Sequence, residues 1–303
     1  MKFDETQLMQ AREALLGEGS AELIRFMHHV SLSLDTGGFP AQTVRQAVDL
    51  GWIDAQSGRP TGTGGCVADS CREYQFWLER AKALPFEGAA PGLSLEYFRG
   101  KSVLEIGSGM GANLMSMSGT AARVCGLEPV ECYAQLGAIL CEREGLPAPE
   151  VLPGAAEALP FGDNHAELIL CVTAHQYFDI RPALTEIARV LRPGGELIII
   201  GATLESCFSE GLGELLHGRH GTKAFAITII NTLSYMTMGR RIIPERSTST
   251  TSRPIYPSQA AMHRWMDATG LIPTMPTVRI GPETCFRFRL APEDVGAAGR
   301  QFA

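Results

Sequence analysis

Three glycines at alternate positions, Gly107, Gly109 and Gly111, directly follow a short apolar run at residues 102–106. Glycine lets the backbone turn sharply and approach a ligand closely, and the helix expected over residues 112–117 presents free N–H groups at its start. A strand that passes through such a loop into a helix predicts a cradle for a nucleotide. The same residues also satisfy the dinucleotide pattern G-x-G-x-x-G/A, so the loop alone does not identify the cofactor.

Three later stretches of the sequence provide further evidence about the cofactor. The hydrophobic run at residues 122–127 is followed by Glu128, whose carboxylate can accept hydrogen bonds from both hydroxyls of a ribose. The segment at residues 154–161 reads Gly-Ala-Ala-Glu-Ala-Leu-Pro-Phe, and residues 184–200 contain the turn Leu-Arg-Pro-Gly-Gly before another apolar run. Dinucleotide-binding enzymes also carry an acid like Glu128, so the last two stretches decide between the cofactors.

With these stretches the chain resembles the class I S-adenosylmethionine-dependent methyltransferases over residues 95–200. The E-x-G-x-G-x-G loop, the A-E-A-L-P-F segment and the L-R-P-G-G turn occur in that family's order and spacing. The resemblance implies an α/β fold, a doubly wound and mostly parallel seven-stranded sheet, and S-adenosyl-L-methionine as the cofactor. It implies a cofactor site made of Glu105, Gly107, Ser108, Gly109, Gly111, Asn113, Glu128, Pro129, Ala156 and Glu157.

The same resemblance assigns parts of the cofactor to parts of this site. The three glycines approach the methionine portion, Glu105 lies near its ammonium end, and Glu128 holds the ribose. The backbone of residues 155–157 faces the adenine. The family commonly has an aspartate at the position of Ala155, so the contact with the adenine amine is lost or is supplied by another group such as Glu157.

His175 is the candidate general base, because it follows the apolar run at residues 166–172 and an imidazole can take a hydroxyl proton near neutral pH. Its surroundings, Thr-Ala-His-Gln-Tyr-Phe-Asp, resemble the H-D-W-x-D segment of small-molecule O-methyltransferases, in which the histidine is the base. Gln176 and Tyr177 replace that family's Asp and Trp, and Tyr177 is a second candidate catalytic residue. The alternative is a histidine that packs or hydrogen-bonds within the loop. Weaker candidates for the base are His217, His220 and His263.

Residues 1–95 are predicted to form a helical, winged-helix-like module. This stretch carries 8 Lys and Arg against 12 Asp and Glu, and the helix that would enter a DNA groove offers only Arg45, opposed by Asp49. We therefore expect the module to pair two subunits or to cover an acceptor pocket, and not to bind DNA. Its helical spacing covers residues 4–16, 21–34, 40–50 and 67–83, with a Gly-rich turn at 57–65.

Residues 96–303 are expected to form the S-adenosylmethionine-binding catalytic domain, because strands and helices alternate as in a parallel sheet. Residues 203–256 are longer than an ordinary crossover and predict a substrate-cap insertion at the carboxyl ends of the strands, with helices at 210–218 and 222–238. The predicted strands lie at 102–106, 122–127, 149–152, 166–172 and 196–201, followed by a helix at 258–269 and a hairpin of strands at 276–280 and 284–290.

The composition indicates which binding partners and which cellular compartment to expect. The 303-residue chain has 45% apolar residues and a net charge of −7, so it lacks a general basic surface for phosphates. The sequence shows no signal-peptide pattern and no apolar run of membrane-spanning length, from which we expect no membrane partner. Eight cysteines without any C-x-x-C pair indicate buried, reduced thiols in a cytoplasmic protein, and no metal centre.

These observations predict a cytoplasmic methyltransferase that uses S-adenosylmethionine and acts on a hydroxyl of a small organic molecule, with His175 as the base. N- or C-methylation stays open, because it needs no further motif. A nucleotide-binding regulator without turnover and a nicotinamide-dependent enzyme are two other classes. The acidic balance and the lack of an N-P-P-Y-type segment after residues 166–172 argue against methylation of RNA or protein.

Overall fold

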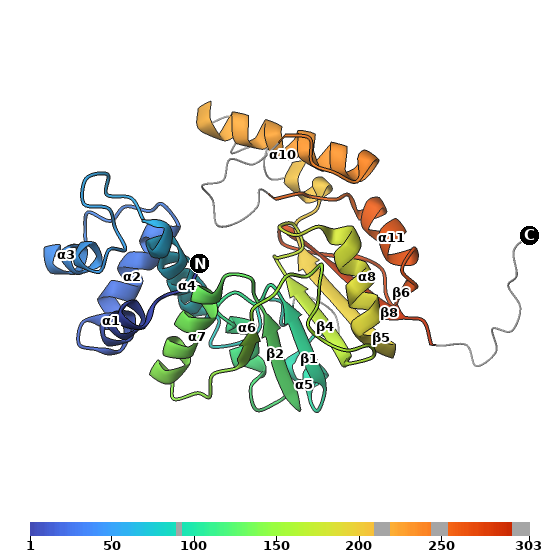
Figure 1. Ribbon diagram of the computed structural model, residues 1–303, viewed down its shortest axis with the longest axis horizontal. Helices are drawn as coiled ribbons and strands as arrows, with labels where there is room; N and C mark the ends of the chain where they lie inside the picture. The colour runs from blue at the N-terminus through green and yellow to red at the C-terminus, as the bar shows by residue number, and fades with distance from the viewer. Residues whose placement is uncertain (89–92, 209–218, 244–253, 293–303) are drawn as a thin grey trace, which may run out of the picture. The chain divides into compact units, whose positions relative to one another are not determined.

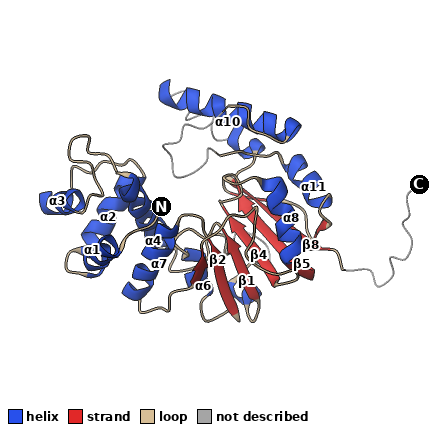
Figure 2. Ribbon diagram, viewed as in Figure 1, coloured by secondary structure: helices blue, strands red, loops and turns tan. Residues whose placement is uncertain are grey.

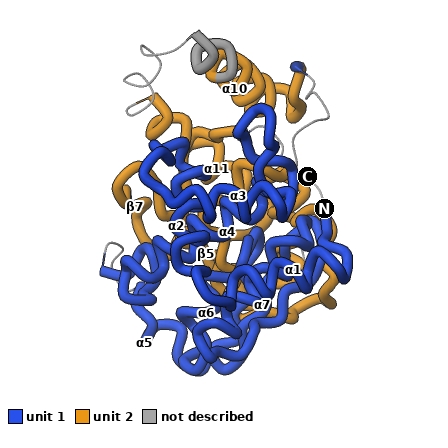
Figure 3. The backbone as a smooth tube through the Cα atoms, turned by 90° about the vertical axis from the view of Figure 1, so that its left-hand side faces the viewer, with its two compact units in different colours: residues 1–155, 243–254 blue, residues 156–242, 255–303 orange. Residues whose placement is uncertain are grey.

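The computed structural model describes residues 1–88, 93–208, 219–243 and 254–292. The chain divides into two compact units, which Figure 3 shows in different colours. The first unit comprises Met1–Ala155 with Ile243–Pro254, and the second comprises Ala156–Ile242 with Ile255–Ala303. The division after Ala155 differs from the boundary predicted at residues 95 and 96, which stays a prediction.

The first unit holds three parallel strands that are short and mostly apolar (Figure 1). The middle strand pairs in register with the first, from Ser102↔Arg123 to Ile106↔Leu127. Because the strands are parallel, the loops that follow them leave from one edge, which is where ligands bind in sheets of this kind. The elements are α5 (Leu95–Phe98), β1 (Ser102–Ile106), α6 (Ala112–Met117), β2 (Arg123–Leu127), α7 (Glu131–Arg143) and β3 (Glu150–Leu152).

The first four helices of the chain share a hydrophobic core with α6 and α7. They are α1 (Glu5–Leu16), α2 (Ser20–Ser31), α3 (Ala41–Asp49) and α4 (Gly62–Glu79). The helix α4 packs along α2 and also contacts α6 and α7, and one cluster of buried side chains extends from Phe3 to Cys141. The Arg143 guanidinium of α7 donates to the Leu15 carbonyl at 2.9 Å and to the Ser20 hydroxyl at 2.7 Å. The N-terminal helices therefore belong to the same compact unit as the glycine loop.

The segment before α4 differs from the extended, Gly-rich turn that the sequence predicts. A single antiparallel bridge joins Ile53 and Pro60, and α4 begins earlier than expected. The Thr61 hydroxyl caps the helix by accepting from the Gly64 N–H at 3.0 Å. A Cβ at Gly64 would lie 1.7 Å from the Trp52 carbonyl oxygen, so this glycine serves close packing of a helix and not a turn. The winged-helix assignment stays a prediction.

The second unit combines parallel and antiparallel strands (Figure 2). The strands β4 and β5 are parallel, and β8 runs antiparallel to β5. The strand order of the chain is β3-β2-β1-β4-β5-β8-β6, with β7 paired to β8. This confirms the α/β fold, with a mixed sheet that has eight strands in the described residues where seven were predicted. The elements are β4 (Ala166–Val172), α8 (Ile180–Val190), β5 (Leu191–Gly201), α10 (Arg219–Met238), α11 (Gln259–Asp267), β6 (Leu271–Pro273), β7 (Val278–Ile280) and β8 (Glu283–Leu290).

One strand boundary in this unit was predicted wrongly, and one strand was missed. β5 begins at Leu191, because the segment expected as a turn before residue 196 already pairs with Ala166 of β4. The short strand β6 was not predicted, since three residues carry too little periodicity to reveal a strand. The helix predicted at 210–218 lies outside the described residues. Within the described part of the chain, no helix combines the length and the apolarity needed to cross a bilayer.

The shared core predicts that the N-terminal helices contribute directly to stability. Leu15 of α1 is fully buried in this core, whereas Met9 of the same helix is 65% exposed. We expect Leu15→Ala to lower the free energy of unfolding by about 2–5 kcal/mol, because it leaves a cavity. The control Met9→Ala should change it by less than about 0.5 kcal/mol. Urea unfolding measures both, and equal effects would contradict a core that includes α1.

Candidate active site

The loop between β1 and α6 turns through three glycines in the left-handed region of backbone conformation. Gly107, Gly109 and Gly111 have φ angles of 70°, 55° and 86°, which other residues rarely adopt. Gly111 is also the residue that precedes the first turn of α6. The structure therefore contains the predicted strand–glycine–helix turn.

Two further glycines, which the sequence analysis did not select, make room for this loop. A Cβ at Gly137 in the middle of α7 would lie 2.0 Å from the Met110 carbonyl oxygen. A Cβ at Gly126 on β2 would lie 2.4 Å from the Ser108 hydroxyl oxygen. A glycine inside a helix or strand is the sequence signal for such a close backbone approach. The loop is therefore held close to both α7 and β2.

Glu105 on β1 is an almost completely buried carboxylic acid, with 2% of its surface exposed. The Asn113 amide donates to its Oε1 at 2.6 Å, whereas Oε2 is buried without a hydrogen-bond partner among the described residues. Burial raises the pKa of Glu105 to about 8; the bond from Asn113 opposes this shift, and the carboxylates of Glu73 and Glu128 add to it. Asn113, a predicted cofactor-binding residue, thus orients Glu105.

Glu128, which follows β2, accepts hydrogen bonds from the loop after β1 and from the segment after β2. Its Oε2 accepts from the Gly109 N–H at 3.1 Å, and its Oε1 accepts from the Val130 N–H at 3.0 Å. Burial raises the pKa of Glu128, and these two hydrogen bonds oppose the shift. A carboxylate oxygen has two lone pairs, so each oxygen can still accept from a ribose hydroxyl. The predicted site residue Pro129 is exposed beside it.

A third carboxylate, Glu73 of α4, faces the same loop and was missed by the sequence analysis. An ideal Cβ at Gly109 would lie 3.0 Å from Glu73 Oε2, and the Met110 backbone donates toward this carboxylate. Burial raises the pKa of Glu73 to about 7. No motif marks this residue, because the loop and the helix are distant in sequence. Only the packing of α4 brings them together.

The acids and the unpartnered polar atoms of this loop are chemically suited to S-adenosylmethionine. The Glu105 Oε2 atom and the Ser108 hydroxyl are buried and lack hydrogen-bond partners in the described part of the chain, so both can receive a polar ligand. The positive-φ glycines add no side chains of their own to the loop, and the carboxylate of Glu73 lies close to Gly109. A ligand that carries a cationic ammonium and a ribose diol would meet Glu105 at one end and Glu128 at the other.

Of the three residues predicted to face the adenine, Ala155 ends the first stretch of the first unit, and Ala156 and Glu157 belong to the second unit. Ala156 is buried and Glu157 is half-buried. The Glu157 Oε1 accepts from the Asp179 N–H at 2.6 Å, at the residue that precedes the first turn of α8. An acid at a helix N-terminus is stabilising, so Glu157 has a structural role that the sequence analysis did not foresee.

His175 lies in the loop between β4 and α8 and is 1% exposed. Its ring packs against Gly201 of β5, where a Cβ would lie 2.7 Å from Nδ1. Burial lowers the pKa of His175 to about 4, and the nearby backbone of Ala202 offsets only part of this shift. Neither ring nitrogen has a partner with hydrogen-bond geometry among the described residues. The imidazole is therefore neutral at pH 7 and enclosed by the protein.

The loop of His175 is attached to the segment that the sequence predicts as a substrate cap. The Tyr235 hydroxyl of α10 donates to Asp179 Oδ1 and accepts from the Arg181 N–H at 3.2 Å. The Ile255 N–H donates to the Gln176 carbonyl at 2.8 Å. Tyr177, the second candidate catalytic residue, is 41% exposed on this loop. The loop is thus fixed from two sides while Tyr177 stays accessible.

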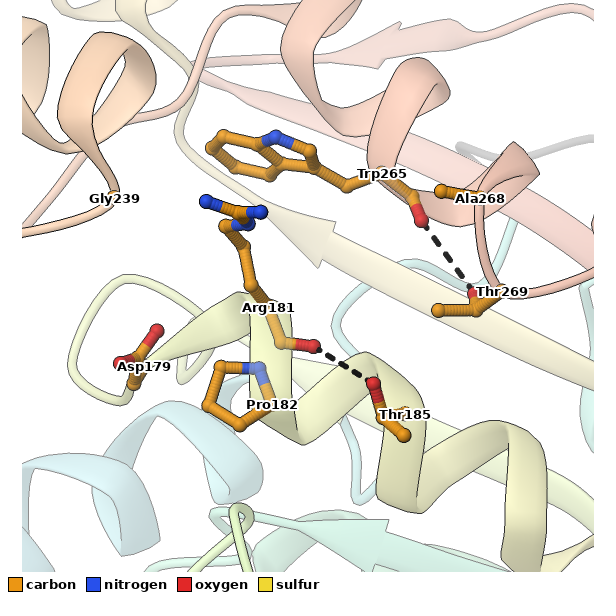
Figure 4. Close-up of a pocket in the computed structure, with 8 residues that line it drawn as sticks. All are labelled: Asp179, Arg181, Pro182, Thr185, Gly239, Trp265, Ala268 and Thr269. Carbon is orange, nitrogen blue, oxygen red and sulfur yellow. Dashed lines mark hydrogen bonds between the residues drawn. The ribbon is translucent and has the colours of Figure 1, made fainter.

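A cavity of about 440 Å³ lies beside this loop within the second unit (Figure 4). Figure 4 shows the Arg181 guanidinium next to the indole of Trp265. The cavity contains none of the predicted cofactor-binding or catalytic residues. Its lining comes from the start of α8, the end of α10 and α11: Asp179, Arg181, Pro182, Thr185, Gly239, Trp265, Ala268 and Thr269.

Comparisons with known proteins agree with the nucleotide-binding geometry. A family model described as "Methyltransferase domain" matches residues 104–199. The uncharacterized methyltransferase YcgJ of Bacillus subtilis is 29% identical over 99 residues, which are 32% of this chain and 39% of that protein. The phthiotriol/phenolphthiotriol dimycocerosates methyltransferase of Mycobacterium tuberculosis is 41% identical over 100 residues, 32% of this chain and 36% of that protein. The match thus spans less than half the length of these curated relatives.

Solved structures extend the similarity of fold beyond the matched segment. One is a chain in the complex between the Haloferax volcanii Trm112 methyltransferase activator and a putative methyltransferase. It superposes with a TM-score of 0.52 at 16% identity, and the alignment covers 78% of this chain and all of that one. At this identity the similarity shows a shared fold.

The buried carboxyl of Glu105 predicts a pH dependence of stability for the ligand-free protein. Its folded-state pKa of about 8 lies above the ordinary value of 4.5, so the folded state binds this proton more tightly. The resulting stability is complete below pH 4.5 and is lost as the pH rises through about 8. Glu105→Gln should therefore unfold at a higher temperature than the wild type at pH 8.5, and this difference should shrink at pH 5.

Thermal unfolding followed by circular dichroism over pH 5–8.5 measures this effect. Glu96→Gln is the matched control, because Glu96 is an exposed acid paired with Arg99 and such surface pairs contribute little. A Glu105→Gln curve parallel to that of the wild type at every pH would refute the assigned shift.

Proposed function

We propose that this protein is a class I S-adenosylmethionine-dependent methyltransferase that transfers a methyl group to a small organic acceptor, and the match of residues 104–199 to a methyltransferase domain model supports this proposal. The observation that carries the proposal is the glycine loop, where Glu105 Oε2 and the Ser108 hydroxyl are buried without partners. These atoms stand where a polar, cationic ligand would complete their hydrogen bonds. Glu128 adds the carboxylate that a ribose diol requires.

The cofactor, when bound, supplies an electrophilic methyl group on a positively charged sulfur. The task of the chain is then to hold the cofactor, align the acceptor and exclude water. Glu105, oriented by Asn113, accepts from the cationic end, and Glu128 accepts from the ribose. Because Glu128 also holds the Gly109 N–H, ribose binding and loop conformation depend on one side chain.

For the acceptor we propose a hydroxyl group that is more acidic than an ordinary alcohol, with His175 taking its proton. The burial that lowers the pKa of His175 to about 4 keeps the ring neutral and able to accept. It also makes the imidazole a weak base, so proton transfer is efficient only from an acidic hydroxyl such as a phenol or enol. The name of the Mycobacterium relative, which refers to a triol, supports oxygen as the methylated atom.

A second candidate is N- or C-methylation by proximity, which the burial of His175 at 1% exposure favours. A neutral amine or a stabilised carbanion needs no base at the moment of transfer, so the enclosed imidazole would only pack the loop. Pairing of subunits through residues 1–95 remains a further proposal. Size-exclusion chromatography of the full chain tests it.

The cofactor assignment predicts a loss of binding in Glu128→Ala. We expect S-adenosylmethionine to bind about 1–3 kcal/mol more weakly, because charge-assisted hydrogen bonds to the ribose are removed. Isothermal titration calorimetry measures the affinity, and circular dichroism checks that the variant is folded. Unchanged affinity in a folded variant would eliminate the ribose assignment. Tight binding of NAD by the wild type would overturn the proposed function itself.

The base assignment predicts that His175→Gln lowers kcat by about 10²–10⁴-fold while cofactor affinity is retained. The wild-type rate should rise with pH through about 4, the pKa of the buried ring, and be level near neutrality. His165→Gln serves as control, because His165 is an exposed histidine of the same unit. Near-full activity of His175→Gln with a hydroxyl acceptor would remove the base role and leave methylation by proximity.

A further inference from the structure

The carboxylate of Glu73 is placed against the glycine loop by a helix that lies outside the methyltransferase domain match. Its two oxygens would lie 3.0 and 3.3 Å from a Cβ at Gly109, and the Met110 backbone donates toward them. Any side chain at position 109 would therefore meet this carboxylate. The positive φ of Gly109 and its missing side chain allow α4 to approach the loop at this point.

Glu73 forms a group of three acids with Glu105 and Glu128. Repulsion from Glu128 raises the pKa of Glu73, and repulsion from Glu73 raises the pKa of Glu105. Within the described residues, no ion pair joins any of the three to a lysine or arginine. The nearest base on the same helix, Arg72, is hydrogen-bonded to Asp69 and Ser31 instead. Three neighbouring carboxyl groups without a cation favour a positively charged ligand.

Two buried atoms at the same loop indicate that a ligand is received there. Glu105 is 2% exposed and its Oε2 has no partner among the described residues. Ser108 is also buried, and its hydroxyl oxygen likewise lacks one. Most buried polar atoms in folded proteins have a hydrogen-bond partner, and a bound ligand would supply one to these two atoms. The acids and the two unsatisfied atoms therefore describe one polar site.

We infer that Glu73 is a cofactor-binding residue that receives the ammonium group of the methionine portion. The inference rests on the proposed function. It assigns to an N-terminal helix a contact that the family resemblance implied for Glu105 alone, and it makes Glu73 of α4 part of the cofactor site. A carboxylate at hydrogen-bond distance from an ammonium is the strong, charge-assisted kind of contact.

Binding of an ammonium group would also change the protonation of the site. Burial holds the pKa of Glu73 at about 7, so a fraction of the carboxyl is protonated at neutral pH in the free protein. A cation lowers that pKa, and the proton leaves on binding. The titratable and charged groups that act on Glu73 from its own and neighbouring elements are Asp69, Arg72, Arg80, Glu105, Glu128 and Tyr133.

The test compares three ligands that differ in the amino-acid portion. S-adenosylmethionine and S-adenosylhomocysteine both carry the ammonium, whereas 5′-methylthioadenosine lacks it. We expect Glu73→Gln to bind the first two on the order of 10–100-fold more weakly and 5′-methylthioadenosine as the wild type does. Glu79→Gln, an exposed acid of the same helix, should bind all three normally. Glu73→Asp, which keeps the charge, should recover part of the loss.

Calorimetry in two buffers of different ionisation enthalpy adds a second readout. The wild type should release protons when S-adenosylhomocysteine binds at pH 7, and Glu73→Gln should release fewer. Equal proton release by the two proteins would contradict the inference.

Four binding results would overturn it. The first is wild-type affinity of Glu73→Gln for S-adenosylhomocysteine, and the second is an equal loss of affinity for 5′-methylthioadenosine. The third is a loss of affinity for S-adenosylmethionine alone. The fourth is unfolding of Glu73→Gln together with wild-type binding by Glu73→Ala. The third result would place Glu73 at the sulfonium. If the wild type bound none of the three ligands, the proposed function would fail as well, which distinguishes that failure from the others.

Discussion

Burial of negative charge around one loop is the constraint on which this structure depends. A carboxylate that leaves water loses solvation that only hydrogen bonds and opposite charge can replace. Backbone N–H groups of Gly109 and Val130 supply part of the replacement to Glu128, and the Asn113 amide supplies part to Glu105. The raised pKa of both residues shows that the compensation is incomplete. A ligand with a positive charge would complete it.

The geometry of this acidic loop in turn depends on helices that precede the domain. Glu73 reaches the loop because α4 is anchored elsewhere: the Trp77 indole donates to the Ser116 hydroxyl at 2.9 Å, and the Tyr74 hydroxyl donates to Glu144 of the segment after α7. These contacts fix the rotation of α4 about its axis and so determine which of its side chains faces Gly109. Stability of the N-terminal helices and affinity for a cationic ligand are therefore linked through one helix.

The sequence predicted the elements whose signal is local. The strand, the alternate glycines and the short helix of residues 102–117 follow from apolar runs and turn residues, and the structure confirms them. It did not predict Glu73 or the roles of Gly126 and Gly137, because these arise from contacts between segments far apart in the chain. The start of α4 was missed for a related reason: glycines usually indicate a turn, but here they allow close helix packing.

In the second unit, the sequence identified a candidate residue but did not reveal its protonation state. His175 was selected for its type and its place after a strand, properties that are visible in sequence. Its protonation depends on enclosure by Gly201 of β5 and the Ala202 backbone, which the sequence does not reveal. An ordinary imidazole would suit many hydroxyls near neutral pH, whereas one with a pKa near 4 suits only those that part easily with a proton. If His175 is the base, burial of its ring therefore restricts the acceptors for which it is effective.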